Sequence, residues 1–114
     1  MADEIRAFAR NLPISAQKMR LVVDLVRGKD VQEALEVLRF VPNGAGRPVY
    51  KLVASAMANA EENFGISRDD LYIYRIFADE GPTRKWRRFG GRGRFKPVLR
   101  RSSQVTVVLR EYQE

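Results

Sequence analysis

The chain has 114 residues, contains neither cysteine nor histidine, and carries a formal net charge of +7 at pH 7. These absences exclude a disulfide framework and a thiolate metal site, and they remove the commonest general base and zinc ligand. No apolar run is long enough to span a membrane and the acidic start is not a signal peptide, so we expect a cytoplasmic protein. The length fits one domain, residues 1–114, and we expect no metal site.

The first expected elements are a strand and a helix. A weak alternation over Arg6–Ile14 indicates a strand, which Pro13 ends. Ser15–Gly28 is predicted to be a helix, because Ser15 is a good N-cap and Gly28 stands where a glycine commonly follows a helix. We expect its apolar face to comprise Met19, Val22, Val23 and Val26, widened by Leu21 and Leu25.

Two further helices are predicted after this one. The second covers Asp30–Phe40, where Asp30 and Glu33 have the spacing of a capping box. Its inner face is expected to comprise Val31, Ala34, Leu35 and Leu38. After a loop over residues 41–46, the longest helix covers Arg47–Gly65, with Pro48 at its first position and Gly65 as its stop. Its apolar stripe is read as core and not as a cofactor site; it consists of Val49, Leu52, Val53, Ala56, Met57, Ala60 and Phe64.

The rest of the chain predicts two strands on either side of a basic segment. Asp70–Pro82 and Ser102–Tyr112 are rich in aromatic and β-branched residues, as strands are, and Val105, Val107 and Leu109 lie on one face of the second. The element order is then β-α-α-α-β-β. We predict an α+β fold, with three helices packed on a small antiparallel three-stranded sheet from which a long β-hairpin protrudes.

The positive charge is concentrated in the segment TRKWRRFGGRGRFKPVLRRS, residues 83–102. It holds nine lysines and arginines and no acid, whereas the 91 residues outside 81–103 carry 12 basic and 14 acidic groups. We therefore predict a globular body, residues 1–80 and 103–114, that carries a basic hairpin over about 81–102.

Such a hairpin favours a nucleic-acid partner. A two-stranded ribbon is marginal alone in water, and its like charges repel one another, so it needs an extensive anionic surface. Lysine and arginine neutralise phosphates, while Trp86, Phe89 and Phe95 offer rings for stacking. RNA is favoured over DNA because an irregular insertion suits loops and unpaired bases. A disordered arginine- and glycine-rich loop and a membrane-surface ribbon are alternatives, but the latter would need an apolar face.

Four stretches together resemble one known family. They are ARNLPISAQKMRLVVDLVRGK, ASAMANAEEN, DEGPTRK and RRSSQVTVVL, which begin at Ala9, Ala54, Asp79 and Arg100. In order and spacing they are similar to the bacterial large-subunit ribosomal protein twenty-two family over roughly residues 5–110. The chain departs from the family pattern at Ala16 and Gln17, where a proline and a basic residue are common, and at the FGGRGRF that begins at Phe89.

The resemblance implies a structural role without catalytic activity, cofactor or small-molecule substrate. Members bind large-subunit rRNA, support early subunit assembly, and line the peptide exit tunnel with the hairpin. The implied partners are the rRNA, neighbouring ribosomal proteins and the nascent peptide. A free-standing RNA chaperone or annealing protein with a basic ribbon is the alternative.

The resemblance also assigns residues. The implied rRNA-binding set is Lys18, Arg20, Asn59, Arg84, Lys85, Trp86, Arg87, Arg88, Arg92, Arg94, Lys96, Arg100 and Arg101. The implied tunnel-lining tip is Phe89, Gly90, Gly91, Arg92 and Gly93.

Three features have plainer interpretations. Lys18 and Arg20 could be solvated helix charges, and Arg20 and Arg27 have helical spacing to Asp24. The acid pairs 61–62, 69–70 and 79–80 are expected to be solvated or capping groups. Three aromatics could form a base-stacking platform, but we expect them to pack on the helices or the hairpin base; they are Tyr72, Tyr74 and Phe77.

Overall fold

The computed structural model describes residues 4–42, 44–81, 84–90 and 94–112, with the backbone alone for 84–90 and 94–100. In chain order the elements are β1 (Glu4–Leu12), α1 (Ala16–Val23), α2 (Val31–Arg39), α3 (Gly46–Phe64), the short 3-10 helix η1 (Arg68–Asp70), β2 (Leu71–Glu80), β3 (Arg84–Gly90), β4 (Arg94–Arg100) and β5 (Ser103–Glu111). The predicted first strand begins and ends two residues too late.

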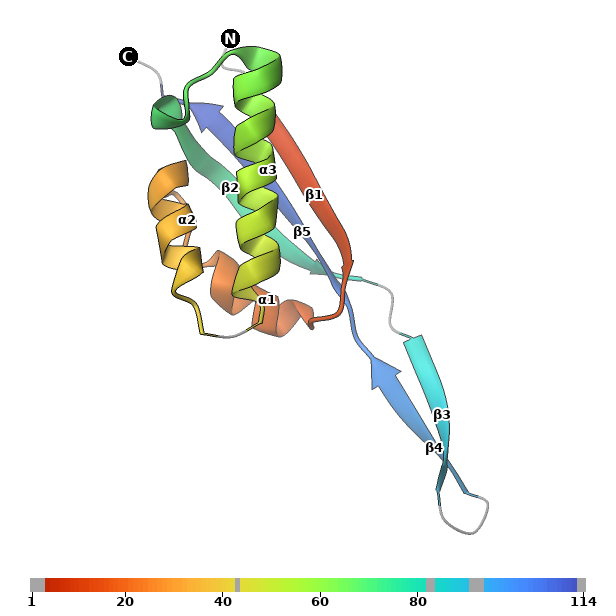
Figure 1. Ribbon diagram of the computed structural model, residues 1–114. Helices are drawn as coiled ribbons and strands as arrows, with labels where there is room; N and C mark the ends of the chain where they lie inside the picture. The colour runs from red at the N-terminus through yellow and green to blue at the C-terminus, as the bar shows by residue number, and fades with distance from the viewer. Residues whose placement is uncertain (1–3, 43, 82–83, 91–93, 113–114) are drawn as a thin grey trace.

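The strands form two antiparallel sheets. The larger has the order β1-β5-β2, and β3 pairs with β4 in the smaller. The three helices lie on one face of the larger sheet, and the β3–β4 ribbon projects beyond the body (Figure 1). The molecule measures 68 × 26 × 19 Å. The predicted α+β fold of three helices on a three-stranded antiparallel sheet is confirmed.

The core lies between the helices and the sheet. The strand residues that face the helices alternate with exposed or half-buried ones, as expected for a sheet covered on one side. From the strands the core receives Ile5, Leu71, Ile73, Ile76, Ala78, Val105, Val107 and Leu109. From the predicted helix stripes it receives Met19, Val22, Val23, Val26, Val31, Ala34, Leu38, Val49, Leu52, Val53, Ala56, Met57 and Ala60.

The first helix ends earlier than its sequence indicates. After Val23 the chain tightens, because the Leu25 and Val26 amides donate to carbonyls three residues back, at 3.1 and 3.2 Å. Gly28 has the left-handed φ of 80° expected of a helix-ending glycine, but its amide donates to the Ile73 carbonyl of β2 at 3.2 Å. The edge of the sheet therefore competes for the backbone that would have continued the helix.

Three large apolar residues predicted to join the core are exposed. Leu21 is 68% exposed, Leu25 50% and Phe64 47%. The predicted widening of the first helix face is therefore wrong, because Met19, Val22, Val23 and Val26 already fill the face that packs on the core, and Leu21 and Leu25 lie outside it.

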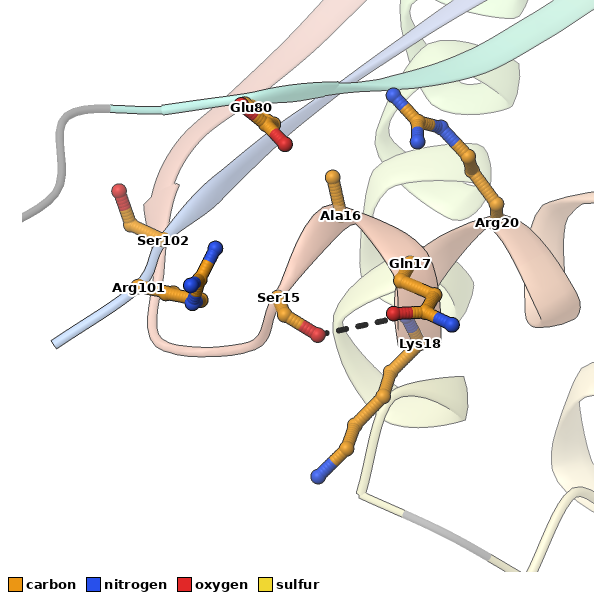
Figure 2. A pocket seen from close by; sticks show the side chains of 8 residues that line it. All are labelled: Ser15, Ala16, Gln17, Lys18, Arg20, Glu80, Arg101 and Ser102. Carbon is orange, nitrogen blue, oxygen red and sulfur yellow. Dashed lines mark hydrogen bonds between the residues drawn. The ribbon is translucent and has the colours of Figure 1, made fainter. Parts of the chain in front are cut away.

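The helix caps agree with the sequence in part. The Ser15 hydroxyl accepts the Lys18 amide at 3.4 Å, as predicted (Figure 2), and Gly65 ends α3 with a φ of 65°. The Asp30–Glu33 capping box is wrong, since the Asp30 carboxylate instead accepts a hydrogen bond from the Tyr112 hydroxyl. Pro48 is not the first residue of α3, which already begins at Gly46.

Candidate nucleic-acid interface

The root of the ribbon meets the start of α1. A hollow of about 620 Å³ lies at this point. Figure 2 shows the residues around it, which come from the start of α1, from the end of β2 and from the link between β4 and β5. It is lined by Ser15, Ala16, Gln17, Lys18, Arg20, Glu80, Arg101 and Ser102. Three cations and one carboxylate therefore share this surface, so that its net charge is positive.

Local structure brings these groups together. The Gly81 amide donates to the Ser102 carbonyl at 2.9 Å, which ties the two strands at the root of the ribbon. A Cβ on Gly81 would lie 2.5 Å from the Ser102 hydroxyl, so a larger residue would have to move that group. The start of α1 adds backbone N–H groups that have no partner within the helix, and such groups favour anions.

Arg20 is also a structural residue. Its Nε donates to the Ala78 carbonyl of β2 at 3.2 Å, and Arg27 donates similarly to the Ile76 carbonyl at 2.8 Å. Arg27 also forms the predicted ion pair with Asp24, at 2.5 Å. Arg20 therefore holds α1, and Arg27 the turn that follows it, against the edge of the sheet, and Arg20 is not simply a solvated helix charge.

The segment after α1 covers the rest of this sheet edge. The Ile73 amide donates to the Lys29 carbonyl at 2.9 Å, and Asp30 forms an isolated β-bridge with Tyr72. The outer edge of β2 is thus occupied over much of its length, as sheet edges must be to avoid pairing with other chains.

Asn59 lies apart from this hollow. It is half-buried on α3 and its side-chain oxygen accepts a hydrogen bond from Asn63. Asn59 does not line the hollow, so the predicted site residues of the body do not form one cluster.

The register of the ribbon places basic residues opposite one another. Arg84 pairs with Arg100, and Arg88 pairs with Lys96. Like charges directly opposite each other destabilise a pair of antiparallel strands, so the sequence of this ribbon opposes its own pairing in the absence of an anion. Phe89 is opposite Phe95, one pair before the end of the described register, where Gly90 pairs with Arg94.

The other predicted site residues of the ribbon are distributed as follows. On β3 lie Arg84, Lys85, Trp86, Arg87, Arg88, Phe89 and Gly90, and on β4 lie Arg94, Lys96 and Arg100. The predicted positions Gly91, Arg92 and Gly93 fall outside the described residues.

The three sheet aromatics do not pack on the helices. Tyr72 stacks on Tyr112 with ring centres 4.7 Å apart, and the Arg110 guanidinium carbon lies 3.4 Å from the centre of the Tyr74 ring. Phe77 is 39% exposed. The predicted helix packing is wrong because these residues alternate with Leu71, Ile73 and Ile76, which fill that face.

The part of the chain that the structure describes was also searched for a metal site and for a membrane span. Those residues contain no cluster of three or more acidic or other ligating side chains suited to a metal ion. A search of the same residues finds no helix with the length and hydropathy of a membrane span.

Comparisons with known proteins agree with the sequence resemblance. The family model described as ribosomal protein L22p/L17e matches residues 7–110. A protein of Pediococcus pentosaceus, the large ribosomal subunit protein uL22, is 46% identical over 117 residues, which cover 100% of this chain and 99% of that protein. The match therefore includes both the body and the basic ribbon.

Proposed function

The chain belongs to the ribosomal protein L22p/L17e family, and on that premise we propose that it is a structural constituent of the large ribosomal subunit. It binds large-subunit rRNA and is not an enzyme. Its partners are this rRNA and neighbouring ribosomal proteins.

The observation that carries this function is the separation of charge along the chain. Every excess positive charge lies in residues 81–103, and the ribbon built from them pairs Arg84 with Arg100 and Arg88 with Lys96. Phosphates between and around these positions would replace repulsion with attraction and release counterions. An extended anionic polymer can line a two-stranded ribbon along its length, which a small anion cannot do.

The hollow at the root of the ribbon is the best candidate for a phosphate contact on the body. It is lined by Lys18 of α1 and by Arg101 of the link between β4 and β5, and the start of α1 adds backbone donors. Arg20 lines it as well while its Nε holds Ala78. We assign the remaining rRNA contacts to Asn59 and to the basic residues and Trp86 of the ribbon, in agreement with the family resemblance.

The tip of the ribbon is assigned to the peptide exit tunnel, where it meets the nascent chain. Family membership supports this role, and the elongated shape of 68 × 26 × 19 Å suits a body at the surface with a ribbon that enters the RNA. The tip residues concerned are Phe89, Gly90, Gly91, Arg92 and Gly93. The chain is then one domain, with a body of residues 1–80 and 103–114 and a hairpin over about 81–102.

The test is incorporation into large subunits in cells that also make the native chain. Arg100→Glu with Arg101→Glu places negative charge against phosphate and should reduce the share of the variant in washed subunits severalfold. Arg39→Glu with Lys51→Glu, which reverses two exposed charges on the helices, is the matched control and should incorporate normally.

Sucrose-gradient co-sedimentation after a moderate-salt wash provides the measurement. A native chain that washes off the subunit while still annealing RNA would favour the free-standing RNA chaperone and contradict a structural role.

A further inference from the structure

The face of the larger sheet opposite the helices is not covered within the described chain. Figure 1 shows that α1, α2 and α3 all lie on one side of β1, β5 and β2. We call the other side the outer face. It comprises Glu4, Arg6, Phe8 and Arg10 of β1, Gln104, Thr106, Val108 and Arg110 of β5, and Tyr72, Tyr74, Arg75, Phe77 and Asp79 of β2.

The strand register arranges this face in alternating rows. Phe8 and Phe77 both pair with Thr106, so that two aromatic residues flank one small hydroxyl residue. In the next row Arg6 and Arg75 both pair with Val108. Neighbouring strands lie about 4.8 Å apart, and alternate residues of one strand about 7 Å apart. Each ring therefore has an arginine about 7 Å away on its own strand: Arg6 beside Phe8, and Arg75 beside Phe77.

Both rings are open to solvent. Phe8 is 58% exposed and Phe77 39% exposed, although phenylalanine is a residue that proteins usually bury. The Arg10 guanidinium carbon lies 5.8 Å from the centre of the Phe8 ring, which places a cation beside an aromatic surface.

The charge of the outer face is positive. Four arginines lie on it, and the acids on the same side of the strands are Glu4 and Asp79. Glu4 is held by Arg110 and Arg6, and the hydrogen bond from Arg110 is the main reason that the pKa of Glu4 falls below its ordinary value. Glu4 therefore stays ionised and orients its two arginines.

We propose that the outer face is a second RNA-binding surface, which takes unpaired bases on Phe8 and Phe77 and their phosphates on Arg6, Arg10 and Arg75. This inference rests on the proposed function and locates a contact of the body with rRNA. Rings combined with arginines are the elements from which proteins build sites for single-stranded nucleic acid.

Two observations favour RNA over a protein partner. The outer face carries four arginines and two acids, and this excess of positive charge suits a polyanion such as RNA better than a protein surface of mixed charge. The outer face is also continuous with the ribbon, since β5 begins at Ser103, directly after Arg100, Arg101 and Ser102. A strand of RNA that follows the ribbon can therefore continue onto the body past one outer-face acid, Asp79, which pairs with Gln104 in the row before the rings.

The first test measures binding of the full chain to protein-free large-subunit rRNA. Phe8→Leu with Phe77→Leu removes both rings and keeps the apolar volume. Loss of base stacking should weaken binding by about tenfold or more. The matched control is Phe40→Leu with Phe64→Leu, because these rings are 82% and 47% exposed on the helical side and should leave the affinity unchanged.

The second test uses the native chain and does not depend on the folding of a variant. Ultraviolet cross-linking of the same complex should join RNA bases to peptides that contain Phe8 or Phe77, and not to those that contain Phe40 or Phe64.

An affinity within twofold of native for the Phe8 and Phe77 variant, together with no cross-link at either ring, would overturn this inference. Cross-links from these rings to a neighbouring ribosomal protein in assembled subunits would overturn it as well. Neither result touches the ribbon, so the proposed function would still be judged by the incorporation of the charge-reversed ribbon.

Discussion

The two antiparallel sheets of this molecule have the same kind of strand pairing and different sources of stability. In the larger sheet, β5 lies between β1 and β2, and one face is sealed by three helices over a continuous apolar core. In the ribbon, β3 and β4 pair with each other, and their register sets basic residues opposite basic residues. The comparison teaches that pairing alone does not stabilise a sheet, and that the body supplies the folding free energy while the ribbon supplies the attraction to RNA.

The largest expected effect on stability is a core truncation in the body. Ile73 is fully buried between the sheet and the helices, so Ile73→Ala should lower the free energy of unfolding by about 2–5 kcal/mol. Leu25→Ala, at a site that is 50% exposed, is the control and should cost less than about 1 kcal/mol. Urea unfolding followed by circular dichroism measures both.

The same unfolding experiment tests whether the ribbon contributes to the stability of the body. Replacement of residues 84–101 by a short Gly-Ser turn removes the ribbon and leaves the core intact. The free energy of unfolding of the body should then change by less than about 1 kcal/mol. A loss as large as that caused by Ile73→Ala would mean that the ribbon supports the fold.

An intermediate effect is expected at Gly46, where α3 begins. A Cβ there would lie 2.9 Å from the Cβ of Val41 and 3.2 Å from the Leu38 carbonyl oxygen. Gly46→Ala should therefore destabilise the body by about 1–3 kcal/mol, as overpacking does. Gly44→Ala is the matched control, because a Cβ at Gly44 meets nothing within 4 Å. Equal melting temperatures for the two variants would show that the start of α3 can shift freely.

The smallest effect is a pH-dependent one at Glu4, whose side chain is partly exposed. Its pKa in the folded chain is lowered from 4.5 by the hydrogen bond from Arg110 and then by that from Arg6. A lowered folded-state pKa gives stability that is fully present well above pH 4.5 and is lost as the pH falls through the folded-state value.

The native chain should therefore exceed a Glu4→Gln variant in stability at pH 7, and the difference should vanish in acid. High salt should also reduce the difference at pH 7, because the pair is partly open to the solvent that carries the screening ions. A difference that grows as the pH falls would have the wrong sign for this account.

Local patterns predicted much of the fold. The spacing of apolar residues located the cores of all three helices, and the alternation of Val105, Val107 and Leu109 oriented β5 correctly. Ser15 and Gly65 act at helix ends through contacts with their immediate neighbours, so the sequence was sufficient to assign them.

The errors have long-range causes. Asp30 bonds to Tyr112 and Gly28 to Ile73, so distant partners changed a predicted cap and a predicted helix end. Arg20 is bound to Ala78, and no local pattern indicates that carbonyl. The close approach of Gly46 to Val41 depends on how α2 packs on α3, and it too left no signal in the sequence.

The candidate RNA-binding surfaces were also predicted only in part from the sequence. The basic composition of residues 83–102 indicated an RNA contact directly. The hollow formed by Lys18 and Arg101 brings together residues 83 positions apart, and the Phe8 and Phe77 row requires the order β1-β5-β2. Chain folding alone creates these two surfaces.

The most direct measurement of the central claim is the salt dependence of rRNA binding by the native chain and by the chain in which residues 84–101 are replaced by a Gly-Ser turn. Each phosphate neutralised contributes roughly −0.7 to −0.9 to the slope of log K against log salt. The replacement removes the nine basic residues of the ribbon, so the slope should flatten by several units, up to about 6–8. An unchanged slope would contradict the account, because the body, with its slight excess of acidic groups, would then carry the attraction to RNA.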